Sequence, residues 1–105
     1  MSTHDHAADV KKYDAAADDA VVAKIVKHLG IALRNRDSSF VAASDPKEVK
    51  TVADSWCKKK MGLTDDAAIA AGIKAVATTM KGDRDKSRVA FYYLLAKHFG
   101  KLGAL

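Results

Sequence analysis

Four of the seven aromatic residues in this 105-residue chain fall within nine positions near the C-terminus, in the segment Arg88-Val89-Ala90-Phe91-Tyr92-Tyr93-Leu94-Leu95-Ala96-Lys97-His98-Phe99. Aromatic side chains bury large areas, so this segment must anchor the core. At helical spacing Phe91, Leu95 and Phe99 share one face, whereas Tyr93 turns toward Lys97 on the other. We therefore expect an amphipathic helix over residues 85–101, with an exposed Tyr93 as a candidate interaction residue.

The composition leaves little room for a β-sheet. Twenty of the fifty-one hydrophobic residues are alanine, the strongest helix former, and the chain has a single proline. Glycines that follow apolar runs are typical of helix ends, and four occur here: Gly30, Gly62, Gly82 and Gly100. The sequence predicts an all-α protein, a compact bundle of four to five helices.

The spacing of apolar residues places the remaining helices. We expect them over residues 18–29, 46–60 and 64–81, with a structured connector over residues 31–43. Asp45 and Pro46 form the clearest start signal, and Glu48 is placed to complete a capping box. The alanines of residues 64–81 would admit close neighbours, which predicts a central position for that helix.

The beginning of the chain differs in charge from the rest. Residues 1–20 carry two lysines and five aspartates, whereas residues 21–105 carry sixteen basic residues and eight acidic ones. We interpret residues 1–17 as an acidic, partly flexible leader in which residues 8–13 can form a short helix. Residues 18–105 are expected to form a single helical domain.

The basic excess suggests a polyanion such as a nucleic acid as one class of partner. The candidate anion-binding residues lie in the connector and around the start of the last helix: Arg34, Arg36, Arg84, Lys86 and Arg88. The alternative is architectural, with Arg36 or Arg88 pairing with Asp37 or a helix end and holding the connector to the bundle. The helical angle of Arg88, which points toward the apolar face, supports this alternative.

Few residues offer metal-binding or catalytic chemistry. After removal of Met1, the free amine, two amide nitrogens and the imidazole of His4 would suit Cu(II) or Ni(II) in a square plane. The alternative is that His4 stands at an unstructured end by chance. Cys57 is expected to be buried packing, and His98 a partly buried histidine. His28, near a helix end, is expected to be a cation favoured by the helix dipole.

No segment is predicted to cross a membrane or to direct export. The longest bulky apolar stretch, residues 91–96, is far shorter than the roughly 20 residues that span a bilayer. The N-terminus has no basic region followed by an apolar one, and a single cysteine cannot form an internal disulfide. We expect a cytoplasmic protein.

The aromatic segment, with Asn35-Arg36-Asp37-Ser38-Ser39 and Ala43-Ser44-Asp45-Pro46, resembles a family of small bacterial proteins named domain of unknown function 2853. The resemblance covers about residues 18–102 and leaves out the leader. It implies a helical cytosolic protein without an assigned activity, and it supplies no site residues.

Function is therefore inferred from the residues themselves. The sequence contains no glycine-rich phosphate loop, nucleophile elbow or zinc-protease motif. This favours a non-catalytic module that binds another protein or itself, with no cofactor. The alternative is binding of nucleic acid or another polyanion through the basic residues, and an enzyme is the third interpretation.

Overall fold

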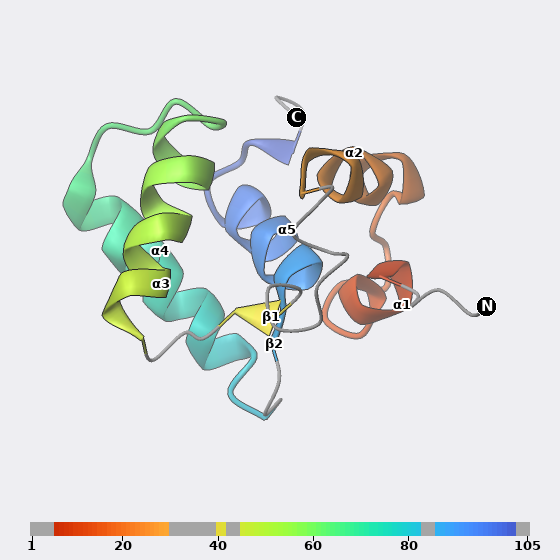
Figure 1. The fold of residues 1–105 in the computed structure, drawn as a ribbon. Helices are drawn as coiled ribbons and strands as arrows, with labels where there is room; N and C mark the ends of the chain where they lie inside the picture. The colour runs from red at the N-terminus through yellow and green to blue at the C-terminus, as the bar shows by residue number, and fades with distance from the viewer. Residues whose placement is uncertain (1–5, 30–39, 42–44, 83–85, 103–105) are drawn as a thin grey trace.

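One helix, α5 (Arg88–His98), runs through the middle of the molecule, and the other elements surround it (Figure 1). The computed structural model describes residues 6–29, 40–41, 45–82 and 86–102. The surrounding elements are α1 (His6–Lys11), α2 (Asp19–Leu29), β1 (Phe40–Val41), α3 (Pro46–Val52), the π-helical segment η3 (Ala53–Lys58), α4 (Asp66–Thr79) and β2 (Lys86–Ser87). The predicted all-α bundle of four to five helices is confirmed.

Burial on every side of α5 is the central feature of this fold. Eight of its eleven residues are buried, because α1, α2, α4, η3 and β1 all contact it. A helix that is apolar all round belongs inside a protein, and residues 89–96 contain no charged side chain. The expectation that this helix has one exposed face is wrong.

Helix α4 lies at the edge of the bundle and not at its centre (Figure 1). Its buried residues Ile69, Ile73 and Val76 face α5 and η3, as the spacing predicted. The alanines that suggested a central position are instead exposed: Ala67, Ala68, Ala70, Ala71 and Ala75. Alanine suits an exposed helix face as well as a close contact, so its abundance could not decide between them.

Two local signals fix the ends of α5. At its start the hydroxyl of Ser87 accepts a 3.3 Å hydrogen bond from the Ala90 N–H. At its end Gly100 has a φ of 68°, its N–H donates to the Lys97 carbonyl, and the Lys101 N–H donates to the Ala96 carbonyl. These bonds form the left-handed glycine ending predicted from the sequence.

The helix predicted over residues 46–60 starts at Pro46 as expected and then changes from an α-helix to a π-helix at Ala53. Asp45 accepts a 3.0 Å bond from the Lys47 N–H, and Pro46 takes the first helical position. From Ala53 onward the carbonyls accept from the fifth residue ahead, as in the 3.0 Å bond from Met61 N to Trp56 O. The wider turn places Trp56 and the adjacent Cys57 inside the core together.

The beginning of the chain also contributes to the core. The short helix expected near residues 8–13 is present as α1, and Val10 on it is fully buried where α1 meets α2 and α5.

Strands β1 and β2 pair antiparallel, with Phe40 opposite Ser87 and Val41 opposite Lys86, a contact that the sequence did not predict. Within the described residues, no helix is both long and apolar enough to span a membrane.

Candidate functional site

The structure does not describe most of the predicted anion-binding residues. Arg34, Arg36 and Arg84 lie outside the described residues, as does the candidate metal ligand His4. For Lys86 the structure gives the backbone, which pairs with Val41. The candidate site therefore has to be built from the remaining side chains.

Arg88 forms an internal ion pair and is not an open anion site. Its side chain is 8% exposed, and its Nη2 pairs with Oε1 of Glu48, in the first turn of α3. Its Nη1 donates a 3.1 Å hydrogen bond to the Tyr92 hydroxyl. The assignment of Arg88 to anion binding is wrong, because these partners bury and neutralise the guanidinium. Arg88 therefore has an architectural role, but its partner among the described residues is Glu48, where the sequence suggested Asp37 or a helix end.

Tyr92 links Arg88 to the π-helical segment. The backbone carbonyl of Tyr92 accepts a 3.0 Å hydrogen bond from Nε1 of the buried Trp56. The two aromatic rings also lie 4.8 Å apart between centroids, at an angle of 31°. A buried indole N–H needs such a partner, so this bond fixes η3 against α5.

Tyr93 is buried, and the prediction that it forms an exposed interaction edge is wrong. It is 3% exposed, and its hydroxyl donates a 2.8 Å hydrogen bond to Oδ2 of Asp14. The same oxygen forms an ion pair with Nζ of Lys97 at 3.0 Å. Burial and the neighbouring Asp14 carboxylate raise the pKa of Tyr93 to about 12, so the hydroxyl stays protonated as a donor.

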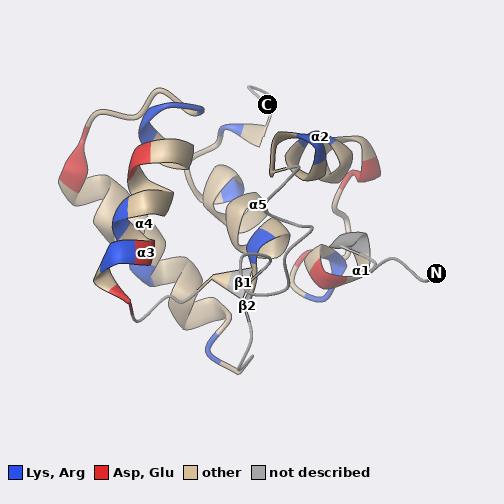
Figure 2. Cartoon of the chain, in the orientation of Figure 1, with Lys and Arg blue, Asp and Glu red and all other residues tan. Residues whose placement is uncertain are grey.

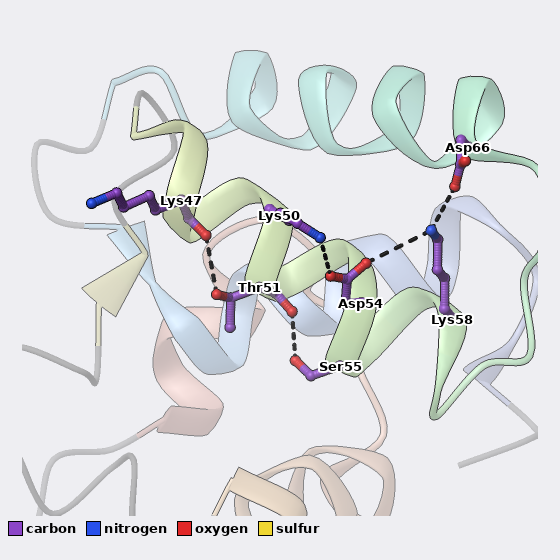
Figure 3. A network of polar contacts seen from close by, with 7 residues as sticks. All are labelled: Lys47, Lys50, Thr51, Asp54, Ser55, Lys58 and Asp66. Carbon is purple, nitrogen blue, oxygen red and sulfur yellow. Dashed lines mark hydrogen bonds and ion pairs between the residues drawn. The ribbon is translucent and has the colours of Figure 1, made fainter.

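An exposed set of polar contacts runs along α3 and η3 to the start of α4 (Figure 3). The Thr51 and Ser55 hydroxyls each donate to the carbonyl four residues earlier, at 3.0 and 2.6 Å. Lys50 and Lys58 both pair with Asp54, and Lys58 also reaches Asp66 at 2.7 Å. The Lys50–Asp54 pair joins neighbouring turns of one helical segment, whereas the Lys58–Asp66 pair reaches α4. Such bonds to carbonyls are common where helices bend, which fits the change to η3.

A group of basic side chains that the sequence did not single out lies where the end of α2 meets η3. We call Lys27, His28, Lys59 and Lys60 the basic cluster; all four are exposed. The ring of His28 lies 5.1 Å from that of Trp56 at an angle of 52°. Figure 2 shows basic residues along α2 and beyond the end of η3.

His28 differs from its expected role as a dipole-favoured cation. Partial burial lowers its pKa below the ordinary 6.5, and the charge of Lys60 lowers it further. The sequence signals were the lysine run 58–60 and the Lys27-His28 pair. These two segments come close because the end of α2 meets the end of η3. Residues that are neighbours in the sequence do not determine that contact.

The other candidates for chemistry are less reactive. Cys57 is fully buried, and burial raises the pKa of its thiol to about 11, as expected for a packing residue. His98 is exposed, not partly buried, and its ring meets Phe99 edge-on at 4.9 Å. Across the described ranges, no group of three or more His, Cys, Asp or Glu side chains could hold a metal ion.

Comparison with known proteins gives a family without an activity. No curated protein matches the chain at a significant level. The family model described as "Protein of unknown function (DUF2853)" matches residues 5–103. The match includes most of the leader, which the resemblance seen in the sequence had left out. Because this match covers nearly the whole chain, the protein belongs to the DUF2853 family of proteins of unknown function.

Proposed function

We propose that the protein is a non-catalytic interaction module that associates with a second copy through the outer face of α4. The observation that carries this proposal is the exposure of Ala67, Ala71 and Ala75, which follow one another at intervals of four residues. Residues at this spacing form one row on a helix, and small side chains allow the axis of another helix to come close.

Charge along α4 favours a second copy as the occupant. Asp65 and Asp66 stand at the start of this helix, where Asp66 also pairs with Lys58, whereas Lys74 lies on its exposed side and Lys81 follows its end. In a two-fold contact between antiparallel α4 helices, the acidic end of each copy would meet the basic end of the other. Contact with a helix of a different protein is the competing occupant.

Three described side chains that could serve catalysis are held in internal contacts or are unreactive: Arg88, Tyr93 and Cys57. Arg88 is neutralised by Glu48, and the Tyr93 hydroxyl is bonded to Asp14. Cys57 has a raised thiol pKa, which disfavours the reactive thiolate. These contacts favour a binding role over an enzymatic one, and the buried free thiol is compatible with a cytoplasmic location.

Light-scattering chromatography over a wide concentration range tests this function. The wild type should show a concentration-dependent dimer, and Ala71→Glu should remove it by placing a charge in the middle of the contact. Ala23→Glu is the matched control, because Ala23 is also an exposed alanine inside a helix, on α2. Circular dichroism should show equal helix content in all three proteins. A monomer at every concentration, or equal loss in both variants, contradicts self-association through α4.

Binding of nucleic acid or another polyanion is the second candidate function. It loses Arg88 as a ligand, since that residue is paired with Glu48. It gains the basic cluster, where Lys59 and Lys60 have no carboxylate partner within the described part of the chain. Polarisation titrations with labelled DNA and RNA at low salt test it, and flat titrations would dismiss it.

A further inference from the structure

The two helix ends that form the basic cluster are held together by a defined contact. His28, in the last turn of α2, packs its imidazole on Trp56 of η3 at 5.1 Å. Trp56 is in turn fixed by its hydrogen bond to the Tyr92 carbonyl of α5. The position of His28 relative to the end of η3 is therefore set by the core and not by an unsupported loop.

Within the part of the chain that the structure describes, the lysines of the basic cluster form no ion pair, unlike several other surface lysines. Ion pairs of 2.7 to 3.0 Å join Lys11 to Asp19, Lys50 to Asp54, Lys58 to Asp66 and Lys97 to Asp14. Lys27, Lys59 and Lys60 have no such partner among the described residues. Lys60 is close enough to His28 for its charge to oppose protonation of the imidazole. Like charges gathered without a counter-charge attract an anion.

We propose that the basic cluster is a phosphate-binding site in which Lys59, Lys60 and the protonated imidazole of His28 contact the phosphate oxygens. Lysine ammonium groups bind phosphate as point charges, and an imidazolium adds a directed N–H donor. The phosphate could be free or part of a nucleic-acid backbone, since the contacts would be the same. This inference rests on the second candidate function and assigns it to side chains other than the predicted arginines.

Binding at this site should be coupled to the protonation of His28. A phosphate beside the imidazole stabilises the charged form, which offsets the effect of Lys60. The pKa of His28 should therefore rise when phosphate saturates the site. The charge that acts on His28 from another element is that of Lys60, and Lys24 and Lys27 belong to its own helix.

The test uses the full chain and two probes, inorganic phosphate and a short single-stranded thymidine oligonucleotide. Nuclear magnetic resonance would follow the His28 ring protons as a function of pH with and without each probe. The double variant Lys59→Ala/Lys60→Ala removes the site. The matched control is Lys47→Ala/Lys50→Ala, which removes the same charge from exposed positions on α3.

The proposal predicts that the site variant weakens binding at least tenfold, while the control changes it less than twofold. For the oligonucleotide, the slope of log affinity against log salt should fall by about 2 in the site variant, one unit per lysine. Saturable binding of both probes would identify a site for phosphate itself, and binding of the oligonucleotide alone would identify the backbone as its source.

Two results would overturn the inference, and they have different meanings. If the oligonucleotide binds but both double variants weaken it equally, or the His28 pKa does not move, polyanion binding stands and this site is wrong. If neither probe binds the wild type at low salt, the site and the second candidate function fail together.

Discussion

The Tyr93 hydroxyl donates a 2.8 Å hydrogen bond to Oδ2 of Asp14, which lies 79 positions earlier in the chain. Lys97 binds the same carboxylate oxygen, one turn further along α5. Asp14 comes directly after α1 and before α2, so these two bonds attach the N-terminal part of the chain to the central helix. Tyr93, which the sequence suggested as a contact for an external partner, therefore binds Asp14 of its own chain.

This contact should make the fold sensitive to acid. The bond from Tyr93 and then that from Lys97 lower the pKa of Asp14 below its ordinary value of 3.8. The stabilisation is present above that value and is lost as pH falls through the lower pKa of the folded state. Urea denaturation across this range should show a steeper loss for the wild type than for Asp14→Asn. Parallel curves for the two proteins would show that Asp14 does not contribute.

Replacing Glu48 should destabilise the protein strongly. Glu48→Gln keeps the shape of the side chain but removes the negative charge that Glu48 places against the buried Arg88, at a cost of about 3 kcal/mol. The free energy of unfolding from urea denaturation measures this loss. In contrast, the double replacement Glu48→Leu/Arg88→Met should recover most of it, because it removes both charges.

Lys50→Gln provides the comparison for an exposed pair. The Lys50 side chain is 76% exposed and pairs with Asp54 on the surface, so loss of this ion pair should hardly change the free energy of unfolding. Equal effects of Glu48→Gln and Lys50→Gln would contradict the burial of the Arg88 pair.

Gly72 of α4 lies directly against the ring of Phe99, which follows α5. A Cβ at this position would meet Cζ of Phe99 and lie 2.8 Å from its Cε2. Alanine is the better helix former, by about 1 kcal/mol, but overpacking costs about 1–3 kcal/mol. We therefore expect Gly72→Ala to lower the free energy of unfolding by about 1 kcal/mol. Phe99→Leu should reduce that penalty in a double-mutant cycle, and additive effects would contradict the contact.

The local signals of this sequence predicted the elements well. The Asp45-Pro46 start and the glycine ending at Gly100 are confirmed, because each depends on residues within a few positions. The change to a π-helix after Val52 was not predicted. It depends on how Trp56 and Cys57 pack on α5, and periodicity does not report such a contact.

The arrangement of the helices, and with it the candidate site, could not be predicted in the same way. Helical angles suggested one apolar face for α5, but an angle does not say how many neighbours a helix has. The pairs Arg88–Glu48 and Tyr93–Asp14 join residues 40 and 79 positions apart. The basic cluster likewise depends on where α2 ends relative to η3.

Cys57 should report on unfolding. Its thiol is fully buried and its pKa is raised to about 11, so the native protein should react very slowly with a thiol reagent at neutral pH. One thiol per chain should react rapidly in concentrated guanidinium chloride. A fast stoichiometric reaction of the native protein, followed by absorbance, would show that η3 opens readily.

His28 should make stability depend on pH in the weakly acidic range. Its pKa in the folded protein lies below the ordinary value of 6.5, because burial against Trp56 and the charge of Lys60 disfavour the imidazolium. Below pH 6.5 the unfolded chain therefore binds more protons than the folded one, and stability falls as pH decreases toward the folded pKa. Thermal denaturation in a buffer free of phosphate measures this dependence, since bound phosphate would stabilise the charged form. His28→Gln should flatten the curve between neutrality and that pKa, and a curve identical to the wild type would show that folding does not lower the pKa of His28.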